Sequence, residues 1–170
     1  MKKLLCSVAC FVMAAICAIP VQLLAQAADT LNVAALPVGN INTVIAGDTL
    51  AGGVRAHPNR VYRLTRGSIY QVTEAMKING SLKIIATTGT TRPPVLAPAI
   101  LADNSSIDHF FEFLGKGAKV EMSNIYLLSA RADGNTLGWS AGIRIWADSV
   151  SLKLRGVMRM SQTWLIGGSS

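Results

Sequence analysis

The sequence feature that most constrains the fold of this chain is an apolar pattern that occurs twice at one constant offset. The pattern first runs from Phe111 to Leu128 and begins again at Ile143. The apolar residues Phe111, Phe113, Val120, Met122 and Ile125 correspond to Ile143, Ile145, Leu152, Leu154 and Val157. Apolar positions at one constant offset, with polar residues between them, are typical of strand-turn-strand units stacked in register. The pattern therefore predicts a solenoid of parallel strands.

Each predicted strand alternates between apolar and charged residues. Phe111-Glu112-Phe113 and Ile143-Arg144-Ile145 place one charge between two apolar residues, and so do Val120-Glu121-Met122 and Leu152-Lys153-Leu154. Because successive side chains of a strand point to opposite faces, the apolar residues are expected to fill an interior and the charges to lie outside.

An earlier and more divergent copy of the unit is expected at Ser81–Ile85. The interval from its Leu82 to Val120 is longer than the interval from Val120 to Leu152, and the extra length predicts a loop insertion. We place that insertion at 87–98, where Gly89 and the Pro93-Pro94 pair would break a strand.

The stacking predicts specific charge pairs. In register, Glu112 should lie beside Arg144, and Glu121 should lie between Lys83 and Lys153, at about 4.8 Å per strand. Opposite charges meet at every one of these positions. Such exposed pairs contribute only about 0 to 1 kcal/mol each, so they specify register more than stability.

Residues 1–27 have the pattern of a secretory signal peptide. Lys2 and Lys3 form a basic start, an apolar run extends from Leu4 to Ile19, and Ala25-Gln26-Ala27 fits a cleavage site. We therefore expect export and a location outside a bacterial cell or on its surface.

Removal of this segment changes the composition of the chain. All three cysteines, Cys6, Cys10 and Cys17, lie in it, so the exported chain can form no disulfide and no thiolate metal site. Of the 16 Lys and Arg, two leave with the segment, and against 9 acidic residues the net charge becomes +5. A modest charge spread between apolar positions indicates a solvated outer face, and no nucleic-acid partner is expected.

The rest of the chain divides into three parts. Residues 28–59 are cut by Gly and Pro into pieces too short for a helix with a full apolar face, and we expect a cap or leading strand there. Residues 60–157 should form the coils, the first of them at 60–72. Residues 158–170 lack the alternation and should be an irregular tail. We expect a fragment of a longer protein, whose uncapped end allows self-association.

The segments NRVYRLTRGSIYQV, SLKII, FEF and KVEMSNIYL resemble the N-terminal coils of secreted right-handed parallel β-helix proteins of the pectate-lyase-like superfamily. The resemblance covers about 40–157 and is greatest to large bacterial surface proteins of that group. It implies an all-β fold, here of about three coils. It implies no single function, because lyases, hydrolases and adhesins share this fold.

The functional candidates lie around the last coil and its loops. Trp139 and Trp146 could stack on a sugar ring, although core or partly buried positions are the more frequent role of such residues. Asp133, Asp148 and Arg144 come nearest to a calcium-assisted lyase site. The basic residues between Arg55 and Arg66 could hold an acidic sugar or phosphate, or form the wet side of an early coil.

No catalytic motif, cofactor or metal site is predicted. His57 and His109 have no Cys or acidic motif at ligand spacing, and no phosphate loop or GxSxG sequence occurs. Two functions therefore remain. The first is a non-catalytic adhesive or structural protein whose partner is an extracellular glycan or another cell-surface component. The alternative is the N-terminal part of a polysaccharide lyase or glycoside hydrolase whose catalytic coils lie elsewhere.

Overall fold

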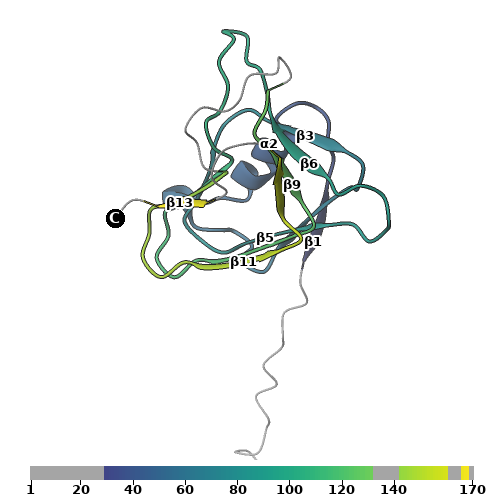
Figure 1. Cartoon of the computed structure of the whole chain (residues 1–170). Helices are drawn as coiled ribbons and strands as arrows, with labels where there is room; N and C mark the ends of the chain where they lie inside the picture. The colour runs from purple at the N-terminus through teal and green to yellow at the C-terminus, as the bar shows by residue number, and fades with distance from the viewer. Residues whose placement is uncertain (1–28, 132–141, 161–165, 169–170) are drawn as a thin grey trace, which may run out of the picture.

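The computed structural model describes residues 29–131, 142–160 and 166–168 (Figure 1). Within these ranges the chain is mostly β, with parallel sheets and little helix. The strands are β1 (Thr30–Val33), β2 (Val61–Leu64), β3 (Ile69–Val72), β4 (Met76–Ile78), β5 (Leu82–Ala86), β6 (Val95–Pro98), β7 (Phe111–Phe113), β8 (Lys119–Ser123), β9 (Tyr126–Leu128), β10 (Ile143–Ile145), β11 (Ser151–Arg155), β12 (Met158–Met160) and β13 (Ile166–Gly168). The helices are α2 (Asn40–Gly47) and the 3-10 helix η1 (Ala51–Gly53), and neither is long and apolar enough to cross a membrane.

The strands form three sheets, which the chain visits in a repeating order. Sheet 1 has the order β1-β2-β5-β8-β11, sheet 2 has β3-β6-β9-β12, and sheet 3 has β4-β7-β10-β13. Within each sheet the neighbouring strands are parallel. From β2 onward, each strand of sheet 1 is followed by one of sheet 2 and one of sheet 3. Every pass through the three sheets therefore lies on the pass before it, and β5 and β11 of sheet 1 run along the same side of the molecule in Figure 1.

The register predicted from the sequence is confirmed. Ile143 pairs with Phe111 and Leu152 with Val120, at the constant offset that the apolar pattern indicated. The divergent copy is also in place, since Leu82 pairs with Val120 and Ile84 with Met122. Strands β5, β8 and β11 thus lie side by side in sheet 1, as the apolar alternation required.

The apolar residues of the alternating pattern form the core between the sheets. Tyr62, Leu64, Tyr70 and Val72 of the first pass are buried. Farther along the stack, the rings of Phe111 and Phe113 are nearly parallel, with centroids 6.2 Å apart. Burial of such side chains contributes about 1.5 to 3 kcal/mol each before the entropy cost of ordering them.

A helix lies where the sequence predicted pieces too short for one. Helix α2 directs Ile41 and Ile45 into the core and packs against β1, β3 and β4. Its buried Asn42 donates a hydrogen bond from Nδ2 to the carbonyl of Glu74 (2.7 Å) and accepts one at Oδ1 from the backbone N–H of Thr73 (3.0 Å). These long-range contacts stabilise a short helix whose own propensity is weak.

Two further segments differ from the prediction. Strand β6 lies inside the predicted insertion: it starts directly after the Pro93-Pro94 pair, and all four of its residues are buried. Strands β12 and β13 lie where an irregular tail was expected, and they extend sheets 2 and 3 beside β9 and β10. Met158-Arg159-Met160 alternates as the earlier strands do and pairs with Tyr126 and Leu128 at the same offset, so the prediction overlooked this copy. Ile166-Gly167-Gly168 has a single large apolar residue, so its pairing with β10 leaves no alternation in the sequence.

Candidate functional site

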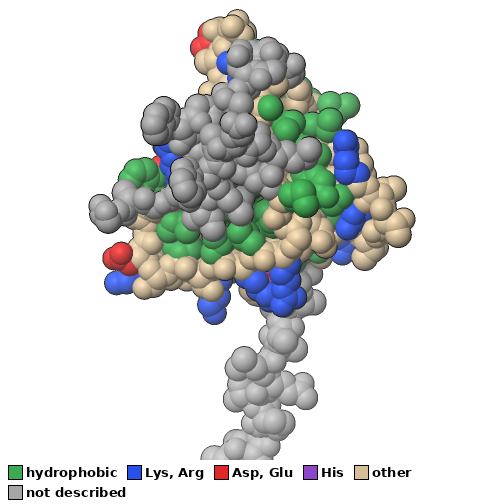
Figure 2. Space-filling model, in the orientation of Figure 1, with side chains coloured by type: hydrophobic (Ala, Val, Ile, Leu, Met, Phe, Trp, Pro, Cys, Tyr) green, Lys and Arg blue, Asp and Glu red, His purple; other side chains and the backbone are tan. Residues whose placement is uncertain are grey.

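The outer face of sheet 1 carries a concentration of basic side chains. Residues that alternate with the buried ones point outward, and register places Lys83, Glu121 and Lys153 in one row across β5, β8 and β11. A second row contains Arg63, on β2, and Arg155, on β11. Figure 2 shows Lys and Arg side chains along the lower edge of the molecule, where β5 and β11 run in Figure 1. This face therefore presents an excess of positive charge to solvent.

A groove of about 600 Å³ lies on this face. Four cationic residues line it, Arg60, Lys83, Lys119 and Lys153, together with one carboxylate, that of Glu121. Strand pairing positions its floor, and the hydroxyl of Ser81 accepts a hydrogen bond from the backbone N–H of Lys119 (3.2 Å). The groove thus combines a rigid β floor with flexible lysine side chains, an arrangement suited to anion binding.

Glu121 lies between two lysines, as the register predicted. Its Oε2 is 3.1 Å from Nζ of Lys83, and its Oε1 is 3.6 Å from Nζ of Lys153. The hydrogen bond from Lys83, aided by the charges of Lys83, Lys153 and Arg155, holds the pKa of Glu121 below its ordinary value. The carboxylate is therefore ionised at neutral pH and compensates part of the basic charge of the groove.

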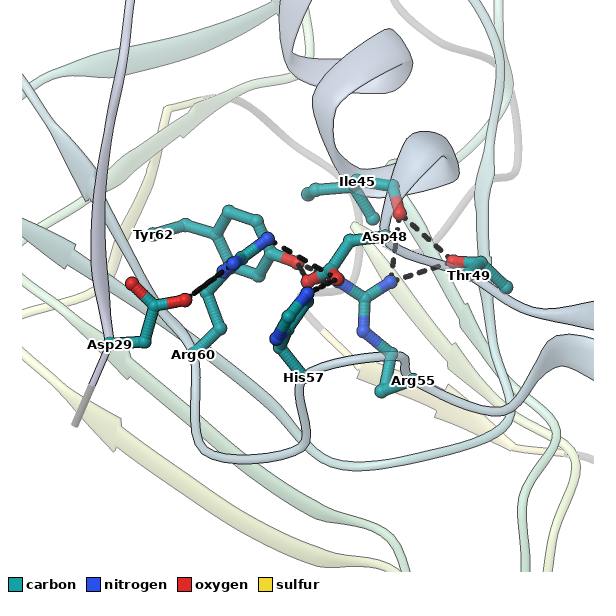
Figure 3. A network of polar contacts seen from close by, with 8 residues as sticks. All are labelled: Asp29, Ile45, Asp48, Thr49, Arg55, His57, Arg60 and Tyr62. Atoms are coloured by element: carbon teal, nitrogen blue, oxygen red, sulfur yellow. Dashed lines mark hydrogen bonds and ion pairs between the residues drawn. The ribbon is translucent and has the colours of Figure 1, made fainter. Parts of the chain in front are cut away.

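A buried polar network reaches the groove through Arg60 (Figure 3). At its centre, the carboxylate of Asp48 accepts hydrogen bonds from Nη2 of Arg55 (3.1 Å) and from the hydroxyl of Tyr62. The guanidinium of Arg55 lies 5.3 Å from the centroid of the Tyr62 ring. Burial lowers the pKa of Arg55, and the charge of Asp48 opposes that effect. The two side chains form an ion pair and are almost completely buried.

The same network orients Arg60 at the groove. Its Nη1 lies 3.3 Å from Oδ1 of Asp48, and its Nε donates to Oδ2 of Asp29 (2.8 Å). His57 lies farther out, with Nε2 at 3.8 Å from Asp48 and about half of its side chain exposed. The basic cluster seen in the sequence is thus divided: Arg55 is a buried structural ion, and Arg60 reaches the groove wall. Sequence reasoning missed Asp48, because only folding brings it to Arg55 and Tyr62.

A second polar cluster lies on the outer face of sheet 3. Glu112 lies in register between Lys77 and Arg144, as predicted for Arg144. Arg144 also forms an ion pair from Nη2 to Oδ2 of Asp108 (2.8 Å). The other oxygen of Asp108 is 2.5 Å from Nδ1 of the buried His109. Nε2 of His109 lies 4.0 Å from Glu112 and has no hydrogen-bond partner among the described residues. Burial raises the pKa of Asp108, but the His109 contact and the Arg144 charge outweigh it and hold that pKa below its usual range.

Among the residues that the structure describes, the candidates predicted from the sequence are not brought together in one site. Trp146 follows β10 with half of its surface exposed, and Asp148 lies exposed in the turn before β11. Arg144 belongs to the sheet 3 cluster just described. Asp133 and Trp139 lie outside the described residues. In the described ranges, no group of three or more His, Cys, Asp or Glu residues could hold a metal ion.

No protein-family model, curated protein or solved structure matches this chain. The function is therefore inferred from the two polar clusters and the charge that each presents.

Proposed function

We propose that the protein is a secreted right-handed parallel β-helix of the pectate-lyase-like type, acting at the bacterial cell surface. Three parallel sheets visited in repeating order support this architecture, because each pass buries its apolar residues against the next. The basic start and apolar run of residues 1–27 support export.

Its function, in this proposal, is non-catalytic binding of an acidic extracellular glycan along the outer face of sheet 1. The observation that carries the proposal is the groove of about 600 Å³, which four cationic residues and a single carboxylate of the described ranges line. A long anionic polymer can contact successive strands of a regular sheet, and many weak charge contacts then add to a useful affinity. Acid–base hydrolysis of a glycan uses a pair of carboxyl groups across the scissile bond, whereas Glu121 is the one carboxylate lining this groove.

Binding of defined polysaccharides tests this function. We expect the purified protein to bind polygalacturonate or dextran sulfate and not neutral dextran, measured by calorimetry at low salt. Replacing both Lys83 and Lys153 by Gln should weaken binding up to about 30-fold, since each exposed charge contributes at most about 1 kcal/mol and the two together at most about 2 kcal/mol. Lys77→Gln is the matched control, because Lys77 is an exposed lysine on sheet 3. Equal binding of neutral and anionic dextrans would contradict the proposal.

The sheet 3 cluster favours a second candidate, a carbohydrate-active enzyme. Asp108 contacts one nitrogen of a buried imidazole whose other nitrogen has no hydrogen-bond partner within the described part of the chain, an arrangement found in acid–base catalysis. Incubation with acidic and neutral polysaccharides, followed by measurement of new reducing ends and of unsaturated products, tests it. Product formation that Asp108→Asn abolishes would support the enzyme over the binding protein.

A further inference from the structure

The basic groove already contains an anion from its own chain, the carboxylate of Glu121. Each of its oxygens faces one ammonium group, Oε2 that of Lys83 and Oε1 that of Lys153. The two lysines lie on opposite sides of Glu121, on the strands that flank β8. The groove thus holds a carboxylate-sized site between two of its cations.

These contacts are accessible to solvent. The side chain of Glu121 is 27% exposed, and those of Lys83 and Lys153 are 44% and 51% exposed. Ion pairs of this exposure open at little free-energy cost, and lysine side chains keep their charge in water while they reorient. A ligand anion can therefore replace the carboxylate of Glu121 without any change in the backbone of sheet 1.

We propose that Glu121 is an internal competitor of the anionic ligand, its carboxylate occupying the site between Lys83 and Lys153 that a carboxylate or sulfate group of the ligand takes on binding. This inference rests on the proposed function. A ligand that must displace a bound group shows a reduced apparent affinity, and the reduction disappears when the competing charge is removed. Glu121 therefore confines binding to polymers with enough charges to contact several strands at once, because a single anion gains little by the exchange.

A purely structural role makes the opposite prediction. If Glu121 only specifies register, its replacement leaves two like charges facing each other across β8 and produces no gain in ligand binding. The sheet 3 row offers a matched residue, because Glu112 also lies in register between two cations, Lys77 and Arg144. Glu112 is not among the residues that line the groove.

The test compares Glu121→Gln with Glu112→Gln in binding to dextran sulfate and to polygalacturonate at one salt concentration. We expect Glu121→Gln to bind about 3- to 10-fold more tightly, and Glu112→Gln to bind as the unsubstituted protein does. Circular dichroism checks that both variants fold, and Glu121→Ser provides a second variant that also removes the charge. Comparison of the affinities for the two polymers shows whether carboxylate or sulfate groups bind more tightly at the site.

A double-mutant cycle separates competition from a change in net charge. In the presence of Glu121, Lys83→Gln should weaken binding only slightly, and in the Glu121→Gln background it should weaken binding several-fold more. Unchanged or weaker binding by Glu121→Gln, or an equal gain from Glu112→Gln, would overturn the inference and leave the proposed function intact. Failure of every form of the protein to bind either polymer would overturn the proposed function itself.

Discussion

Individual charged residues of this chain act in two different ways. Lys83, Glu121 and Lys153 lie at the surface in register, where each contact is weak and reversible. Asp48 and Arg55 form an ion pair with side chains only 3% and 2% exposed. The first set is suited to exchange with a ligand. The second set links helix α2 to the first pass through the sheets, and neither ion can lose its partner without cost.

Replacement of Asp48 by Ala should therefore destabilise the protein strongly. Arg55 would keep its buried charge without a carboxylate, which costs about 3 to 5 kcal/mol in the free energy of unfolding. Urea denaturation at pH 7 measures the change. His57→Gln is the control: its side chain is about half exposed and 3.8 Å from Asp48, so we expect a change below about 1 kcal/mol. Equal effects of the two substitutions would show that Asp48 is not the centre of the network.

At the scale of elements, turns of successive passes also stack on one another, as the turns after β4 and β7 show. The turn after β7 lies directly on the turn after β4, where the N–H of Leu114 donates to the carbonyl of Ile78 (2.9 Å). A Cβ atom at Gly115 would lie 1.9 Å from the backbone oxygen of Asn79. Glycine at this position is thus required by the close approach of two backbones.

Gly115→Ala should separate these turns and lower the free energy of unfolding by about 1 to 3 kcal/mol, as overpacking does. Gly47→Ala is a control with the opposite sign. Gly47 is the last residue of α2, and a Cβ atom there meets nothing within 4 Å. Alanine in a helix should stabilise by about 0.5 to 1 kcal/mol. Thermal unfolding of both variants measures the difference, and a neutral Gly115→Ala would mean that the turns are not in close contact.

The molecule as a whole is a stack in which each strand depends on the strands above and below it. In sheet 1, β5 lies between β2 and β8, and β8 lies between β5 and β11. The free energy of unfolding of such a stack is approximately the sum of the stabilities of the single passes and of the contacts between neighbouring passes. Opening should therefore be easiest where the core is least covered: Val120 and Met122 of β8 are fully buried, whereas Leu152 and Leu154 of β11 are only partly buried.

Hydrogen exchange followed by mass spectrometry should show this gradient. We expect the slowest amide exchange in β5 and β8 and faster exchange in β11, because local opening costs less where a strand has fewer buried contacts. Uniform protection along sheet 1 would indicate a single cooperative unit instead of a stack of neighbouring units.

The pairing of β5, β8 and β11 and the charge row on their outer face could both be predicted from the amino-acid pattern. Both follow from a constant offset and a period of two, which are properties of short segments. Burial of Tyr62 and Leu64 follows the same alternation, whereas the network that Tyr62 shares with Asp48 does not follow from it.

The positions of the irregular segments, and the ions that these segments bring together, depend on the folded molecule. Helix α2 forms in a glycine-rich stretch because the core beneath it buries Ile41 and Ile45. Arg144 is in register with Glu112 and also forms an ion pair with Asp108, because the loop before β7 brings Asp108 close to β10. The physical reason is that strand alternation is encoded locally, whereas a buried ion pair depends on loops whose conformation is selected by packing against distant strands.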